Sequence, residues 1–472
     1  MKRFLTVVLC LMLVLPVLAQ DPPELRAVYV TIWDANTPAK CDSVIANVLA
    51  RNINAVYLHI RARGDAYYFP NREDSTYPNS EPRAQLYSVT PADLDVLQYF
   101  IDRLHNASPR VEVHAWVVVY PTWNRVSPPS SPNHVYNLHP EWITENSLGN
   151  TINYPITANG QEAPLDPGVP AVQDYLYNVF MDIVRNYDVD GIHFDYIRLL
   201  STDSGFDPVA KAAFLAETGW NYDTDNSSGR LDVVYKAWRR DQISRLVQRV
   251  HTRTMLEKPW VEVSPFVIHF DDPVEVRGQG YNWWVAHGAV DVVHLSTYSS
   301  TQSGNVSNWN FLVGKLAASG HQNTRPLVAA IGDYLLTGPS PNYSDSVVTT
   351  LRGNTRPPDG FNFFDYGSLF LDGSPAAEHA NRLFNPGGPM DDWAPVPSMP
   401  HKADEESVPP NAPASLAVTL VGGVPRITFS RPAAAADGDL PVHYRLYRDT
   451  SPSVRLYYDN MVMEWWDPAS SR

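Results

Sequence analysis

Short apolar runs rich in β-branched and aromatic residues alternate along the chain with longer segments whose apolar residues recur at helical spacing. The runs predict strands and the longer segments predict helices. The predicted strands are Arg26–Trp33, Asn54–Arg61, Val111–Val119, Val189–Arg198, Trp260–Phe266, Val290–Thr297, Pro326–Gly332 and Phe361–Asp365. The predicted helices are Cys41–Arg51, Pro91–Asn106, Gly168–Tyr187, Pro208–Thr218, Leu231–Leu256, Tyr281–His287, Phe311–Ser319 and Ala376–Phe384.

Eight β-runs separated by helical segments are typical of an α/β fold of the (β/α)8 TIM barrel type, with parallel strands. The predicted barrel occupies residues 24–390 of the 472. Residues 391–410 are rich in proline and charge, which predicts a stiff linker. Residues 411–472 resemble the opening strands of a fibronectin type III module. The segment is shorter than the roughly 100 residues of such a sandwich, so an incomplete module is expected.

The first residues have the features of a secretory signal peptide. Lys2 and Arg3 precede an apolar run that ends at a small-residue site near Ala19, so residues 1–19 are expected to direct export to the periplasm or beyond. The run is short for a membrane span, and no membrane insertion is expected. Cys41 is then the single cysteine of the mature chain, so no disulfide within the chain is expected.

The formal net charge of −15 argues against a nucleic-acid partner, because such binding relies on clustered Lys and Arg. The 13 Trp and 25 Tyr fit sugar-stacking surfaces and a large core equally well. The sequence does not predict an oligomeric state.

The stretch Val189–Arg198 carries the first candidate for chemistry. Its strand ends at Asp195, where the C-terminal mouth of a barrel would place a catalytic group. An aspartate at such a site is costly unless it is hydrogen-bonded or functional, so a catalytic role is favoured. Alternation places His193 on the same face as Asp195, where it either orients Asp195 or is satisfied in the core, and it places Tyr196 on the opposite, outer face. Arg198 is a candidate for binding substrate, with an ordinary surface arginine as the alternative.

Polar and aromatic residues also gather near the ends of other predicted strands, which indicates a polar pocket. Alternation puts Tyr57, His59 and Arg61 on one face of the second strand and His114 and Trp116 on one face of the third. The candidate substrate-binding residues are Arg61, His114, Trp116, Tyr120, His193, Arg198, His294 and Tyr298.

Glycoside cleavage normally uses two carboxyl groups, one protonated and one ionised. With Asp195 as one, Asp65 and Asp271 are the leading candidates for the second, and Asp272, Asp333 and Asp365 also follow predicted strands. No zinc-hydrolase, nucleophile-elbow, P-loop or dinucleotide motif is present, so no metal or cofactor is expected.

Several segments together resemble the family-10-like glycosyl hydrolases, a bacterial group long catalogued as a domain of unknown function. The matching segments are ELRAVYV at 24–30, NAVYLHIRARGDAYY at 54–68, VEVHAW at 111–116, HPEW at 139–142, LDPGVP at 165–170, YDVDGIHFDY at 187–196, WRR at 238–240, VSPF at 263–266 and DVVHLSTY at 291–298. The resemblance implies a barrel that hydrolyses glycosidic bonds in a polysaccharide, with bacterial cell-wall glycan as one substrate. Tyr196 replaces a second acid found in many members, and His59 replaces a common glutamine. The alternative is a non-catalytic barrel that only binds glycan.

Overall fold

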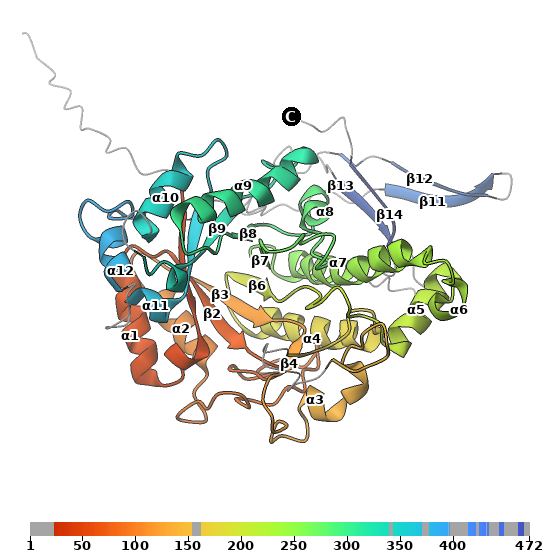
Figure 1. Ribbon diagram of the computed structural model, residues 1–472, viewed down its shortest axis with the longest axis horizontal. Coiled ribbons are helices and arrows are strands. Elements are labelled where there is room, and N and C mark those ends of the chain that lie inside the picture. Colours follow the sequence, from red (N-terminus) through yellow and green to blue (C-terminus); the bar gives the residue numbers. More distant parts are fainter. Residues whose placement is uncertain are drawn as a thin grey trace, which may run out of the picture.

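The computed structural model describes residues 23–152, 162–338, 343–370, 377–394, 396, 414–421, 424–430, 432–433, 443–447 and 461–466. Eight parallel strands close a barrel in the order β1-β10-β9-β8-β7-β6-β3-β2, and helices surround it (Figure 1). The predicted (β/α)8 fold is therefore confirmed. The barrel strands are β1 Leu25–Val30, β2 Ala55–Arg61, β3 Glu112–Val118, β6 Gly191–Asp195, β7 Glu262–Val267, β8 Val293–Ser296, β9 Leu327–Gly332 and β10 Gly360–Phe364.

Amphipathic helices cover the outside of the barrel, and their buried faces share one core cluster with the outward residues of the strands. In Figure 1, α5 and α6 lie beyond this ring, at the margin of the molecule. The helices are α1 Pro38–Leu49, α2 Val96–Leu104, α3 Val135–Leu138, α4 Pro170–Asn186, α5 Pro208–Thr218, α6 Tyr222–Asp225, α7 Leu231–Glu257, α8 Tyr281–Ala286, α9 Gln302–Ala318, α10 Ser344–Arg352, α11 Tyr366–Phe370 and α12 Ala377–Phe384. Short 3-10 turns are η1 Ile32–Asp34, η2 Pro140–Trp142 and η3 Asp333–Leu335, and a small antiparallel pair joins β4 Pro121–Trp123 to β5 Ala163–Pro164.

Some element boundaries differ from those expected. The first strand ends at Val30 because the chain turns into η1. The second predicted helix begins at Val96, where the Asp95 side chain accepts a hydrogen bond from the Gln98 amide and caps the helix. Helix α9 begins nine residues earlier than predicted, capped by Thr301. Helix α10 was not predicted.

The barrel interior is filled largely by aromatic and polar side chains. Tyr29, Tyr57 and His114 lie side by side on β1, β2 and β3, with the Tyr57 and His114 rings stacked at 4.4 Å between centroids. Gly191 takes the neighbouring position on β6. A Cβ atom there would come within 2.2 Å of the His114 ring, so only glycine fits this imidazole in the interior.

The chain enters and leaves the barrel at the same end. The Asn54 side chain, just before β2, donates to the backbone oxygens of Glu24 at 2.8 Å and Ala394 at 3.0 Å. Asn54 also accepts a hydrogen bond from the Arg26 amide. These contacts lie at the amino ends of the strands, opposite the barrel mouth.

The C-terminal part contains two antiparallel pairs, β11 Ala414–Val421 with β12 Val424–Ser430, and β13 His443–Tyr447 with β14 Met461–Trp466. Two-stranded pairs do not identify a fibronectin type III fold, which stays a prediction. The predicted signal peptide and most of the predicted linker lie outside the described residues. No helix among the described residues is long and apolar enough to cross a membrane.

Candidate active site

Asp195 is the last residue of β6, and its carboxylate is partly buried at the barrel mouth. Its Oδ2 accepts a hydrogen bond of 3.1 Å from the Trp116 indole, and its Oδ1 accepts one of 2.7 Å from the Tyr196 amide. Burial raises the pKa of Asp195 above its usual value. The positive charge of Arg198 and the hydrogen bond from Trp116 oppose this rise without cancelling it. The carboxyl group therefore keeps its proton to higher pH than an ordinary aspartate.

The Trp116 side chain on β3 contacts residues of both neighbouring strands, β2 and β6. Its indole stacks on the His59 ring of β2, with 4.2 Å between centroids and 21° between planes. His59 is buried, and neither ring nitrogen has a hydrogen-bond partner among the described residues. Burial, helped by the charge of Arg63, lowers the pKa of His59 to about 3. His59 is thus neutral and supports the indole that contacts Asp195.

Tyr196 lies beside Asp195 and not on the outer face that alternation predicts. Its φ of 53° is left-handed, so the strand ends abruptly and the side chain turns toward the mouth. The guanidinium carbon of Arg198 is 4.4 Å from the Tyr196 ring centroid, and that of Arg63 is 5.8 Å away. The ring therefore lies beside the two arginines that interact electrostatically with Asp195.

His193 lies deeper in the barrel and does not contact Asp195 by a hydrogen bond. Its Nε2 is 2.9 Å from the Tyr29 hydroxyl, and its Nδ1 is 3.0 Å from the Ser264 hydroxyl. Burial lowers the pKa of His193 well below its usual value. Of the two roles left open by the sequence, this geometry supports a satisfied residue of the barrel interior.

His294 and His114 also lie inside the barrel. His294 Nδ1 is 3.3 Å from the Asn362 amide nitrogen. His114 Nε2 is 3.0 Å from Glu112, and its Nδ1 is 3.8 Å from Glu262. Because His114 pairs with Gly191 at the start of β6, it lies below the mouth and not beside Asp195.

Arg61 does not share a face with His59, contrary to the alternation prediction. A β-bulge between these residues turns Arg61 out of the barrel. Its guanidinium forms a buried ion pair of 2.7 Å with Glu81 and donates to the Val119 carbonyl at 2.8 Å. Tyr120 is buried after β3, and its hydroxyl has no partner among the described residues.

Most candidates for the second carboxyl group already have structural partners. Asp65 is fully buried and accepts hydrogen bonds from the Gln85 and Leu86 amides. Asp271 is exposed and paired with Arg277. Asp272 is bound by Lys315, and Asp333 is fully buried against Ser344 and His379.

Two aspartates that follow the neighbouring strands β1 and β10, Asp34 in η1 and Asp365 directly after β10, interact electrostatically at the mouth. Burial, together with the charge of Asp365, raises the pKa of Asp34. Burial raises the pKa of the Tyr298 phenol, and the negative charges of Asp195 and Asp365 add to this rise. Asp34 did not emerge from the sequence because the predicted first strand ran to Trp33. The 3-10 turn that carries it has no clear periodic signal.

Glu162, which the sequence did not indicate, also lies near Asp195. It is nine-tenths buried, and one carboxylate oxygen pairs with Arg63 while Oε2 has no hydrogen-bond partner among the described residues. Arg198 interacts electrostatically with both Asp195 and Glu162. Glu162 is in a long proline-rich loop, where no strand pattern marks it.

Aromatic side chains surround the mouth. Tyr298 packs on Phe266 at 5.6 Å and on Phe364 at 6.0 Å between ring centroids. Trp33 after β1, Phe270 after β7 and Tyr334 after β9 leave 42–46% of their surface exposed. Because β1 and β7 lie opposite each other in the barrel, Trp33 and Phe270 are on opposite sides of Asp195 and its neighbours. No cluster of three or more His, Cys, Asp or Glu suited to a metal ion occurs among the described residues.

A closed parallel barrel with a carboxyl group and aromatic rings at its mouth defines a TIM-barrel protein of the glycosyl hydrolase type. The chain belongs to the glycosyl hydrolase-like 10 family, whose model matches residues 24–330. The family resemblance seen in the sequence is therefore confirmed.

Two curated relatives are named glycosyl hydrolases. YngK of Bacillus subtilis (strain 168) is 26% identical over 315 residues, covering 60% of this chain and 55% of YngK. DigH of Escherichia coli (strain K12) is 26% identical over 272 residues, covering 52% of this chain and 54% of DigH. The chain thus spans about half the length of these relatives.

Among solved structures, the glycoside hydrolase domain of PgaB (BpsB) from Bordetella bronchiseptica has a similar fold. The TM-score is 0.55 at 15% identity, covering 76% of this chain and 98% of that domain.

Proposed function

We propose that the protein is a glycoside hydrolase that cleaves O-glycosidic bonds in a polysaccharide, with Asp195 as the general acid. The observation that carries the proposal is the environment of Asp195 at the mouth of a barrel of this family. A partly buried carboxyl group with a raised pKa is suited to hold a proton and deliver it to a leaving oxygen. The exposed aromatic side chains around the mouth offer stacking faces for sugar rings.

The reaction needs a second, ionised carboxylate. Two groups are available: Glu162, and the pair formed by Asp34 and Asp365. Glu162 forms an ion pair with Arg63, which holds its carboxylate near the mouth. In the pair, burial and the charge of Asp365 raise the pKa of Asp34, which makes Asp34 less suited to be the ionised group.

The test is hydrolysis by the purified protein of peptide-free cell-wall glycan strands and a panel of plant and bacterial polysaccharides. The parent protein is expected to release reducing ends from one of them. Asp195→Asn is expected to lower the rate by about 10²–10⁴-fold, as for loss of a general acid. Asp174→Asn, on the exposed outside of α4, is the matched control. Glycan binding without cleavage by any variant would instead establish the non-catalytic alternative.

We also propose that the protein is exported. The support is the basic, apolar and small-residue order of residues 1–19. Amino-terminal sequencing of protein from the native host is expected to begin after Ala19. A mature chain that begins at Met1 or Lys2 would contradict export by this signal.

A further inference from the structure

Two cavities lie beside the barrel mouth on the side of β6, and neither is lined by Asp195 itself. The inner cavity has a volume of about 250 Å³ and is lined by Asn146, Asn150, Ile152, Glu162, Leu200 and Asp203, among others. The outer cavity has a volume of about 390 Å³, within the range of about 300–1,000 Å³ that small-molecule sites occupy. Asp203 lines both cavities, so they adjoin.

Glu162 lines the inner cavity and also pairs with a residue at the mouth. Glu162 is nine-tenths buried, and its Oε2 has no hydrogen-bond partner within the part of the chain that the structure describes. The other oxygen of Glu162 pairs with Arg63, which lies over the ring of Tyr196 next to Asp195. A carboxylate that lines the inner cavity is therefore one arginine away from the proposed catalytic group.

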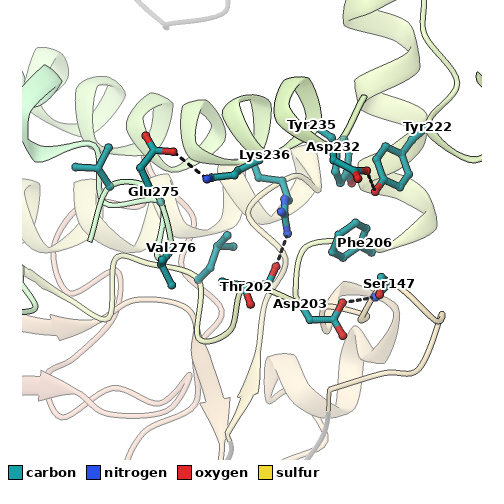
Figure 2. A pocket seen from close by; sticks show the side chains of 14 residues that line it. Ser147, Thr202, Asp203, Phe206, Tyr222, Asp232, Tyr235, Lys236, Glu275 and Val276 are labelled. Carbon is teal, nitrogen blue, oxygen red and sulfur yellow. Dashed lines mark hydrogen bonds and ion pairs between the residues drawn. The ribbon is translucent and has the colours of Figure 1, made fainter. Parts of the chain in front are cut away.

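The outer cavity combines an aromatic wall with hydrogen-bonding groups. Figure 2 shows Tyr222 near Phe206 and Tyr235, with Asp203 and Ser147 below them. The Tyr222 ring centroid is 5.7 Å from that of Phe206, and its hydroxyl donates to Asp232 at 2.9 Å. These contacts fix the orientation of the half-buried Tyr222 ring.

The acids of the outer cavity keep acceptor capacity. Asp203 is exposed, and its Oδ1 accepts a hydrogen bond of 2.8 Å from the Ser147 amide. Across the cavity, Lys236 and Glu275 form an ion pair of 2.8 Å (Figure 2). A rigid aromatic ring beside carboxylates and an ammonium group suits a sugar, which has an apolar ring face and hydroxyls that both donate and accept.

The position of the outer cavity follows from the chain. Its walls come from the segment after Asp195, from α6 and α7, and from the segment after β7. Helices α5 and α6 are additions to the barrel pattern, placed directly after the strand that carries Asp195. The same segment of chain thus leads from the proposed catalytic group to the cavities.

We propose that the two cavities form one groove that binds successive sugar units of a glycan chain beyond the barrel mouth. The proposal rests on the proposed hydrolase function and adds that the preferred substrate is a long chain. Sugar units in the groove would hold the polymer while the bond at Asp195 is cleaved. Affinity should therefore increase with chain length until the groove is filled.

The test measures binding by the full chain carrying Asp195→Asn, which prevents cleavage. The probes are peptide-free cell-wall glycan strands fractionated by length, together with their disaccharide unit. Affinity is expected to rise with length. Adding Asp203→Ala or Tyr222→Ala should weaken binding of long strands by about tenfold, equivalent to about 1.4 kcal/mol, and flatten the dependence on length. Asp223→Asn is the matched control, because Asp223 is on α6 but does not line the cavity. This variant should keep the dependence of affinity on strand length.

Tyr222→Ala removes packing as well as a binding face, so Asp203→Ala, at an exposed side chain, provides the second measurement. Unchanged length dependence in the folded Asp203→Ala and Tyr222→Ala variants would overturn the groove. Length-dependent binding that these variants abolish, with no cleavage by the parent protein, would support the groove while the hydrolase proposal fails. If cleavage requires Asp195 but affinity is equal for strands of all lengths, the hydrolase proposal stands and the groove proposal is rejected.

Discussion

The indole of Trp116 donates a hydrogen bond of 3.1 Å to Asp195 from the neighbouring strand of the barrel. The two residues are 79 positions apart in sequence, yet the parallel pairing of β3 with β6 places them together. The hydrogen bond stabilises the ionised carboxylate and so limits the rise in its pKa. Trp116 therefore helps to position Asp195 and limits the rise in its pKa.

Replacing Trp116 by Phe should move the alkaline limb of the pH profile of kcat/KM to higher pH. Loss of the hydrogen bond raises the pKa of Asp195 further, so the protonated acid persists to higher pH. The rate at its optimum should fall by about 10- to 150-fold, since a hydrogen bond to a charged group is worth about 1.5–3 kcal/mol. Rates on the cleaved polysaccharide across pH check this. A limb that stays in place would show that the indole does not affect the acid.

Arg61→Met should lower the free energy of unfolding by about 3–5 kcal/mol, because it leaves the buried Glu81 without its positively charged partner. The double variant Arg61→Met with Glu81→Met should recover much of this loss. Urea denaturation of the three proteins measures the effect. A fully stable Arg61→Met variant that binds glycan poorly would favour the sequence-based role in substrate binding.

Stability should depend on pH through His114. Burial alone would lower its pKa, but the carboxylates of Glu262 and Glu112 outweigh burial and raise it. A raised pKa in the folded state stabilises the protein fully below the unfolded value of about 6.5, and this stabilisation is lost as pH rises through the folded value. The difference in unfolding free energy between the parent and His114→Gln should therefore shrink as pH increases. A constant difference would show that the imidazole does not titrate differently on folding.

Gly191→Ala should destabilise the protein by at least about 1–3 kcal/mol, because the added methyl group would overlap the His114 ring. Gly314→Ala in α9 is the matched control, since nothing lies within 4 Å of its Cβ position. There the change should be neutral or stabilising by up to about 1 kcal/mol. Thermal unfolding of both variants distinguishes local overlap from a general effect of replacing glycine.

The barrel could be predicted because its signal is periodic. All eight strands were found, since buried parallel strands read as β-rich apolar runs between helices. The environment of Asp195 could be predicted only in part. Alternation placed Trp116 correctly, but it failed at Arg61, where a bulge adds a residue, and at Tyr196, where a left-handed φ ends the strand.

Groups outside the strands could not be predicted in this way. Glu162 approaches Asp195 through Arg63, a tertiary contact between segments 99 residues apart. Asp34 depends on where a short 3-10 turn begins. Neither position follows from the local sequence pattern, because each is decided by packing around the mouth.

Asn54 gives the barrel a functional polarity. By binding the backbone at Glu24 and at Ala394, it gathers the incoming and outgoing chain at the closed end. The segment that reaches Ala394 is thus held at the end of the barrel opposite Asp195, away from the mouth where the proposed polymer substrate would bind.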